Sequence, residues 1–166
     1  MTHRCYLLGL CLLLSGCAEY QFTVNDKVVY EPPPLFSDYQ TGDQALQACL
    51  EQHIRDANAT SAAGLTQLNC SHAGVRSLQG IEVFSGLQSI KLASNAITDI
   101  GPLSTLAELK RLHLEGNAIR SLLPLRGLEQ LEFLDLTGNA ALVCAELDYF
   151  RRLSALELLP PAHCGA

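Results

Sequence analysis

The chain has 166 residues, of which 48% are hydrophobic and 17% are charged, a balance that supports a packed core and argues against global disorder. Its formal net charge is −6. Because a protein that binds nucleic acid or anionic lipid by charge needs a basic face, this balance argues against both kinds of partner.

The first element is an apolar run from Cys5 to Leu14, preceded by the positive charge of Arg4. The run is shorter than the roughly 20 residues that cross a bilayer as a helix, and it is typical of the core of a signal peptide. The residues that end it, Leu14-Ser15-Gly16-Cys17, resemble the lipobox of bacterial lipoproteins. The resemblance implies a signal peptide over residues 1–16 and lipidation of Cys17, so that several acyl chains hold the protein on a membrane. An ordinary secretory signal with a chance cysteine is the alternative.

The residue after the lipobox bears on the choice of membrane. Position 18 is Ala, whereas an Asp at this position in enteric lipoproteins favours retention in the inner membrane. The resemblance therefore implies an acylated (palmitate-bearing) lipoprotein of the outer membrane that faces the periplasm or the cell exterior.

Residues 17–42 are predicted to form the lipidated tether. Apolar residues alternate over Tyr20–Val24 and again over Val28–Tyr30, on either side of Asn25-Asp26, which is the pattern of a small hairpin. Pro32-Pro33-Pro34 follows as a stiff extended spacer. A plain tether that lifts the folded part off the membrane and a hairpin packed on that part both remain open.

Residues 43–64 are predicted to form a helical N-terminal cap. The segment from Asp43 to Ala57 is amphipathic, with Leu46, Cys49 and Leu50 on one face together with His53 or Ile54. His53 is interpreted as part of the cap surface rather than as a ligand.

Residues 65–152 contain four copies of one pattern, each 22 residues long, which begin at Leu65, Leu87, Leu109 and Leu131. Several columns stay in phase through all four copies. The residue three positions after the first leucine of each copy is aliphatic, and the residue two positions later is Leu or Cys. The residue another three positions later is Asn in every copy but the first. These columns are Leu68, Ile90, Leu112 and Leu134; Cys70, Leu92, Leu114 and Leu136; and Ala73, Asn95, Asn117 and Asn139.

The pattern Leu-x-x-Leu-x-Leu-x-x-Asn-x-Ile resembles the leucine-rich-repeat family, and the 22-residue form with Pro102 and Pro124 is most similar to the bacterial internalin type. The resemblance implies an α/β solenoid: a right-handed superhelix of strands and short α or 3-10 segments, with a parallel sheet on its concave side. The residues point the same way, because Leu-x-Leu alternation makes a short half-buried strand and one copy buries too little to stand alone. The Asn amide can satisfy both donors and acceptors where the chain turns inward.

The C-terminal flank is predicted to cap the other end of the stack. The segment from Ala145 to Leu156 is predicted to be a helix that Pro160-Pro161 stops, and residues 153–166 are assigned to the C-terminal cap.

Four cysteines remain if Cys5 and Cys11 leave with the signal peptide and Cys17 takes lipid. Four cysteines in an exported protein indicate two disulfides, for which three pairings exist. The pairing of neighbours along the chain, Cys49 with Cys70 and Cys144 with Cys164, is favoured. No Cys-x-x-Cys motif supports a metal site, so neither a metal nor a cofactor is expected.

The outward residues of the predicted strands are the candidate site. Neighbouring copies align them into one mixed-charge patch with a single aromatic residue, which is typical of a protein-binding surface. A solvated sheet face without a ligand is the alternative. The patch consists of Lys91, Arg111, His113, Glu115, Phe133 and Asp135.

No catalytic motif is present, and an enzyme is not expected. His113 beside Asp135 is the one pair that resembles a base with an orienting acid, but no nucleophile accompanies it. The sequence therefore predicts a membrane-anchored module that binds a protein, or alternatively a glycan, in the bacterial cell envelope. A structural envelope lipoprotein without a dedicated ligand is the second interpretation. The internalin resemblance does not transfer adhesion to host cells, because one fold serves many functions.

Overall fold

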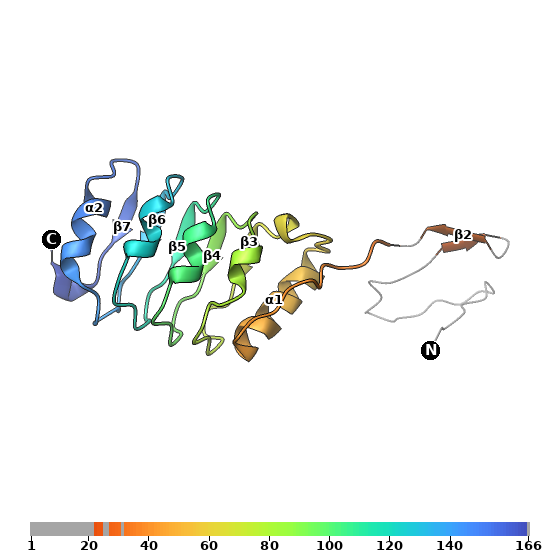
Figure 1. The fold of residues 1–166 in the computed structure, drawn as a ribbon, viewed down its shortest axis with the longest axis horizontal. Coiled ribbons are helices and arrows are strands. Elements are labelled where there is room, and N and C mark those ends of the chain that lie inside the picture. The colour runs from red at the N-terminus through yellow and green to blue at the C-terminus, as the bar shows by residue number, and fades with distance from the viewer. Residues whose placement is uncertain (1–21, 25–26, 31, 166) are drawn as a thin grey trace, which may run out of the picture. The chain divides into compact units, whose positions relative to one another are not determined.

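The computed structural model describes residues 22–24, 27–30 and 32–165 (Figure 1). The chain divides into two compact units, Met1–Pro34 and Leu35–Ala166. The predicted signal peptide and Cys17 lie outside the described residues. In the first unit, β1 (Phe22–Val24) pairs in antiparallel fashion with β2 (Lys27–Tyr30), at the positions where the sequence alternates. In the part of the chain that is described, no helix has the length and apolar character needed to span a bilayer.

Five short parallel strands form the sheet of the second unit, in the order in which they occur along the chain (Figure 1). Each strand of the first four is displaced by 22 residues from the next, so that Leu68 pairs with Ile90, Ile90 with Leu112 and Leu112 with Leu134. The strands are β3 (Gln67–Asn69), β4 (Ser89–Lys91), β5 (Arg111–His113), β6 (Phe133–Asp135) and β7 (Glu157–Leu159).

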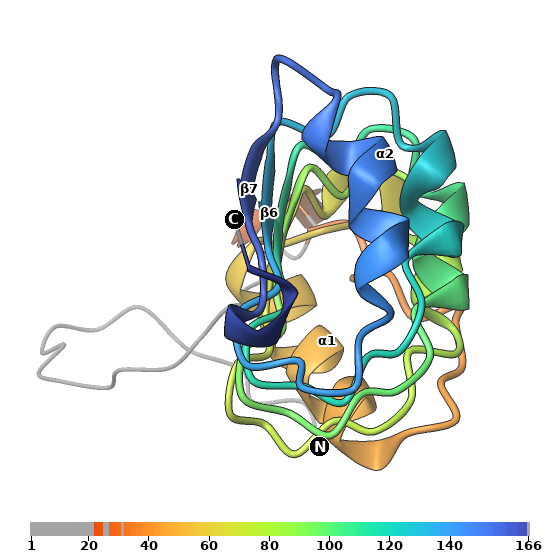
Figure 2. The same ribbon diagram turned by 90° about the vertical axis from the view of Figure 1, so that its left-hand side faces the viewer.

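Short 3-10 segments return the chain to the next strand on the opposite side of the stack. Figure 2 shows the two layers, with β6 and β7 in the strand layer and α2 beside the short helical segments opposite. Pro102 and Pro124 lie in the first turn of two of these segments, where a residue without an N–H is tolerated. The segments are η2 (Ile81–Val83), η3 (Gly101–Thr105) and η4 (Leu123–Gly127).

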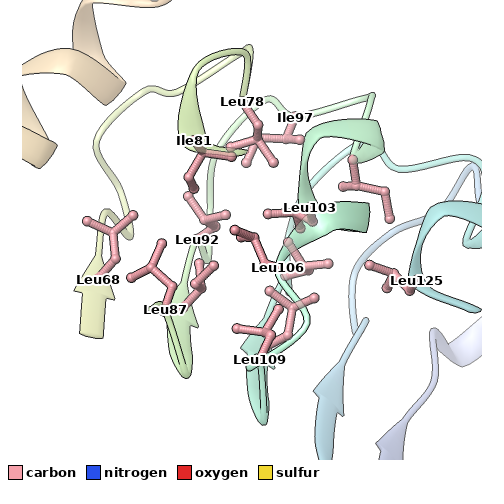
Figure 3. Close-up of a cluster of buried hydrophobic side chains, with 14 of the residues drawn as sticks. Leu68, Leu78, Ile81, Leu87, Leu92, Ile97, Leu103, Leu106, Leu109 and Leu125 are labelled. Atoms are coloured by element: carbon pink, nitrogen blue, oxygen red, sulfur yellow. The ribbon is translucent and has the colours of Figure 1, made fainter. Parts of the chain in front are cut away.

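The core is the space between the two layers. In Figure 3, Leu68 of β3 approaches the opposite layer together with Leu87 and Leu109, which lie just before β4 and β5. The residues labelled on that opposite side include Leu78, Ile81 and Leu103. Nearly all of these side chains are completely buried. Each contributes about 1.5–3 kcal/mol relative to an exposed position, but only when a neighbouring copy covers it. The fold predicted from the repeat pattern is therefore confirmed.

A column of asparagines joins consecutive copies at the inward turn. The amide of the fully buried Asn139 donates to the carbonyls of Leu114 (2.9 Å) and Leu136 (3.0 Å), and its oxygen accepts from the N–H of Ile119 (3.1 Å). Asn95 and Asn117 repeat this arrangement in the preceding copies. Each Asn thus forms hydrogen bonds with backbone groups of two copies, which would otherwise have no partner at the turn.

The N-terminal end of the stack is covered by α1 (Gln44–Asp56), which begins after the N-cap Asp43 as the amphipathic pattern predicts (Figure 1). Leu46, Leu50 and Ile54 form its buried face. His53 lies at the open edge of β3, where its Nε2 accepts the N–H of Asn69 at 3.1 Å while Nδ1 donates to the carbonyl of Cys49 at 2.9 Å. The helix therefore closes the free edge of the sheet as well as covering the core.

The predicted tether is too long at its C-terminal end, because residues 35–42 belong to the folded unit. Phe36 and Tyr39 pack on Phe84, with ring centroids 5.8 and 5.0 Å apart, and the N–H of Phe36 donates to the carbonyl of Ala59. Gly80, at φ +98°, allows the backbone of Gln40 to approach so closely that a Cβ would lie 2.1 Å from its carbonyl oxygen. The prediction missed this packing although the apolar residues were visible in the sequence.

The C-terminal end also differs from the prediction. The helix expected over residues 145–156 is shortened to η5 (Cys144–Glu146) and α2 (Leu147–Arg151), and the predicted cap contains β7 and η6 (Ala162–Cys164) rather than a helix. Leu134 pairs with Leu158, so the spacing to the fifth strand exceeds the 22 residues of the other copies. The break in period concealed this strand from the sequence pattern.

Both ends carry a disulfide, and the bonds join the cysteines that are neighbours along the chain. Cys49 of α1 is bonded to Cys70 just after β3, and Cys144 of η5 is bonded to Cys164 of η6. Each closes a loop of about 20 residues, which by loop entropy is worth about 3 kcal/mol. The covalent links thus reinforce the two ends, where a solenoid lacks a neighbouring copy.

Candidate binding surface on the concave sheet

The concave face is the outward side of β3–β7 together with Glu115, which follows β5. Because the middle residue of each strand points into the core, the residues on either side of it point to solvent. The parallel register then aligns these residues in columns across the sheet. The columns are Gln67, Ser89, Arg111, Phe133 and Glu157, and Asn69, Lys91, His113, Asp135 and Leu159.

The register brings the six predicted patch residues into one region of this face. Five lie on β4, β5 and β6, and Glu115 lies two residues beyond His113. Their exposure is not uniform, because Lys91 and Arg111 are exposed, while His113, Glu115 and Asp135 are half-buried. The two basic residues of the patch are therefore more accessible to a partner than its imidazole and its two carboxylates.

Phe133 does not provide the exposed aromatic anchor that the sequence suggested, because only 8% of its surface is accessible. The guanidinium carbon of Arg111 lies 4.8 Å from the ring centroid, and the ring of His113 lies 4.6 Å from it at an interplanar angle of 37°. Two side chains of the neighbouring strand therefore cover the ring. Phe133 acts as a platform that holds Arg111 and His113 in place, by cation–π attraction and ring packing.

His113, Glu115 and Asp135 form a compact polar cluster beside this platform. Nδ1 of His113 lies 3.9 Å from Oε2 of Glu115. Oδ1 of Asp135 accepts from the backbone N–H of Thr137 at 2.9 Å and from its hydroxyl at 2.8 Å. One donor atom from each of the three residues lies within 4.8 Å of the others. The cluster combines two carboxylates with one imidazole in the middle of the sheet.

The base-and-acid interpretation of His113 and Asp135 finds no support in these contacts. Over the described residues, no hydrogen bond joins the two side chains, and the nearest carboxylate contact of the His113 ring is with Glu115. Oδ1 of Asp135 is already occupied by Thr137. The arrangement therefore lacks the geometry of a general base with its orienting acid.

Charge separates along the concave face. Lys91 and Arg111 place positive charge on β4 and β5, whereas Asp135 and Glu157 place negative charge on β6 and β7. The side chain of Lys91 also borders a shallow hollow toward the N-terminal end. The hollow is lined by His53, Gln67, Leu68, Asn69, Ser89 and Lys91.

The part of the concave face that β7 contributes was not predicted from the sequence. Glu157 extends the column of Phe133, and Leu159, which is 37% exposed, extends that of Asp135. The alternation of Leu156 and Leu158 was the available signal, but it lies outside the 22-residue period.

A stack of 22-residue coils, with parallel strands on one side, 3-10 segments on the other and Asn at the inward turns, is a leucine-rich-repeat solenoid. The family model described as leucine rich repeat matches residues 85–142. The comparison with curated proteins finds no match.

Two solved structures of Listeria monocytogenes internalins are similar to this chain. Internalin C2 has a TM-score of 0.62 and 25% identity, over 72% of this chain and 54% of its own. A second internalin, inlF, has a TM-score of 0.62 and 26% identity, over 74% of this chain and 37% of its own. The chain thus spans about half the length of the first and little more than a third of the second, and the likeness supports an internalin-like repeat fold.

Proposed function

We propose that the protein is a non-catalytic binding module of the bacterial cell envelope, which recognises a protein partner through the concave face. The observation that carries this proposal is the exposed residue Arg111, whose guanidinium lies over the ring of Phe133 on an inner strand of the sheet. A side chain held in its binding geometry before the partner arrives loses less conformational entropy on binding. Arginine is also enriched among the residues that dominate binding energy at protein interfaces.

The charge separation favours a partner whose own surface is divided in the same way. An acidic region would lie against Lys91 and Arg111, and a basic region against Asp135 and Glu157. Opposite charges steer encounter and fix orientation more than they add affinity. Recognition of this kind should therefore weaken as ionic strength rises.

We further propose that the solenoid is held on the outer membrane by lipid at Cys17. This part of the proposal rests on the sequence Leu14-Ser15-Gly16-Cys17 directly after an apolar run. Several acyl chains hold a protein on a membrane essentially permanently.

Site-specific cross-linking in cells tests the protein-binding proposal. A photoactivatable amino acid at Lys91 should give a discrete cross-linked adduct, whereas the same group at Ser104, which is exposed on η3 on the opposite side of the stack, should not. The captured protein is then purified and its affinity measured in the presence of a chelator.

Charge reversal provides the matched variants. Arg111→Glu and Asp135→Lys should each weaken binding of the purified partner by at least 10-fold, while Ser104→Glu should leave it unchanged. Circular dichroism confirms that each variant is folded. Equal adducts from Lys91 and Ser104, or an affinity insensitive to both reversals, would refute the concave face as the binding surface. A captured glycan in place of a protein would refute the proposed class of partner.

A further inference from the structure

The cluster of His113, Glu115 and Asp135 is built by the backbone of the two inner strands β5 and β6. His113 and Asp135 are register partners, and Glu115 follows His113 by two residues, with the buried Leu114 between them. Neighbouring positions on one face of a sheet lie about 5–7 Å apart, which lets side chains of this length converge. Their nearest donor atoms lie within 4.8 Å of one another. The sheet thus brings two carboxylates and one imidazole together on its outward face.

One of the four carboxylate oxygens in this cluster is buried without a hydrogen bond from the described residues. Oε2 of Glu115 is shielded from solvent and has no hydrogen-bond partner within the described part of the chain. Nδ1 of His113 lies 3.9 Å from this oxygen, which is beyond hydrogen-bond distance. A carboxylate oxygen in this position is costly unless a positive charge compensates it. The arrangement therefore favours a bound cation.

The neighbours of the cluster fix two of its three donors. Thr137 donates its N–H and its hydroxyl to Oδ1 of Asp135, which leaves the second oxygen of that carboxylate for another contact. The ring of His113 packs on Phe133 at 4.6 Å between centroids. Metal ligands are characteristically oriented by such supporting contacts.

We propose that His113, Glu115 and Asp135 together bind one divalent transition-metal ion, for which Zn²⁺ is the best-fitting species. An imidazole nitrogen with two carboxylate oxygens suits zinc, whereas magnesium and calcium prefer oxygen ligands alone. With zinc–ligand distances of about 2.0–2.2 Å, tetrahedral ligand atoms lie about 3.3 Å apart. Reaching this spacing requires rotation of the side chains, and those of His113 and Glu115, which are 21% and 33% exposed, have room on the solvent side to rotate. A fourth ligand position then faces the solvent side of the sheet.

This site lies within the surface proposed to bind a protein, but it requires no macromolecular partner. The test is isothermal titration of the purified, disulfide-bonded protein with Zn²⁺ alone, after treatment with a chelator and its removal. We expect one ion per chain. His113→Ala, Glu115→Gln and Asp135→Asn should each weaken the affinity at least 10-fold.

Two other histidines provide the controls. His72 is exposed in the first repeat, and His163 lies beside Cys144 and Cys164, whose sulfurs are committed to a disulfide. His72→Ala and His163→Ala should leave the affinity unchanged. Substitution of Co²⁺ for Zn²⁺ adds a spectroscopic measurement, because a tetrahedral Co²⁺ site absorbs strongly in the visible range. This absorption should be present in the wild type and absent in His113→Ala.

Binding should also raise the thermal midpoint by about 5–11 °C at a Zn²⁺ concentration of about 100 times the Kd. Absence of stoichiometric binding overturns the proposal, as does equal affinity of the wild type, His113→Ala and Asp135→Asn. Loss of the site in His163→Ala instead would place the ion elsewhere and would also overturn it. Because the affinity for the purified protein partner is measured in the presence of a chelator, failure of the metal site leaves the proposed function standing.

Discussion

Asp43 connects the N-terminal cap to the first repeat through both oxygens of one carboxylate. Oδ1 accepts the N–H groups of Ala45 (2.9 Å) and Leu46 (3.0 Å) at the start of α1. Oδ2 accepts those of Arg76 (2.8 Å) and Ser77 (3.0 Å), more than thirty residues along the chain. Removal of this carboxylate therefore tests whether these four hydrogen bonds hold the cap on the first repeat.

The expected loss of stability has two parts, one from the N-cap of α1 and one from the hydrogen bonds to Arg76 and Ser77. Loss of an N-cap costs about 1 kcal/mol, and a hydrogen bond to a charged acceptor is worth about 1.5–3 kcal/mol before it is discounted for partial exposure. Asp43→Ala should lower the free energy of unfolding by about 2–4 kcal/mol. Asp43→Asn should cost less, because the amide oxygen can still cap α1 while its NH₂ cannot accept from Arg76 and Ser77.

The same contacts give the effect a defined pH dependence. Partial burial raises the pKa of Asp43, but the four backbone hydrogen bonds, from Arg76, Leu46, Ser77 and Ala45, together outweigh it and lower that pKa below its ordinary value of 3.8. A carboxylate with a depressed folded-state pKa stabilises the fold above its unfolded-state pKa, and this stability is lost as the pH falls through the folded-state pKa. The difference between the wild type and Asp43→Ala should therefore be full at neutral pH and shrink in acid.

Urea denaturation followed by circular dichroism at neutral and acidic pH measures this difference. Asp38→Ala is the matched control, because Asp38 is an exposed Asp five residues earlier in the chain. A loss below about 0.5 kcal/mol for Asp43→Ala, comparable to an ordinary surface substitution, would refute the reasoning. A loss that is independent of pH would refute its electrostatic part.

Three further predictions follow from single residues. Asn139→Ala should destabilise the protein by about 3–5 kcal/mol in chemical denaturation, because it removes three buried hydrogen bonds and leaves the carbonyl of Leu114 and the N–H of Ile119 without their Asn partner, whereas the carbonyl of Leu136 still accepts the backbone N–H of residue 139. A cost equal to that of a surface substitution would contradict the role given to the Asn column. His53→Ala should cost about 1 kcal/mol and speed hydrogen exchange at the Asn69 amide, because the variant removes the acceptor of that N–H. An exchange rate equal to that of the wild type would contradict this role of His53. Cys17→Ser should abolish incorporation of labelled palmitate and release the protein from the membrane fraction, whereas Cys11→Ser should not; labelling of Cys17→Ser would rule out that cysteine as the lipid attachment site.

The sequence predicted the fold through its period. Four copies with Leu, Ile and Asn in fixed columns leave the chain little alternative to stacking, since each copy satisfies its own core and its own turn only through the next. The placement of Lys91, Arg111, His113 and Asp135 on one face followed from the same period, because a parallel register aligns equivalent residues of consecutive copies.

The features that the sequence did not reveal lie where the period fails. The fifth strand begins two residues late, so Leu158 is out of phase with Leu134, and the segment around it was assigned to a helix and cap. Residues 35–42 have no counterpart in any copy, and the packing of Phe36 and Tyr39 on Phe84 is a tertiary contact that a local pattern cannot specify.

The burial of Phe133 shows why a correct fold does not give a correct site. The alternation of the strand places its side chain on the outward face, where an exposed aromatic was expected. Arg111 and His113 on the neighbouring strand are long enough to lie across the ring, so the outward aromatic becomes a support for the two polar groups. At Phe133, a partner of this surface consequently meets charged side chains before it meets the aromatic ring. A partner should therefore be sensitive to the sign of the charge at Arg111 and Asp135, and affected by Phe133 only through their positions.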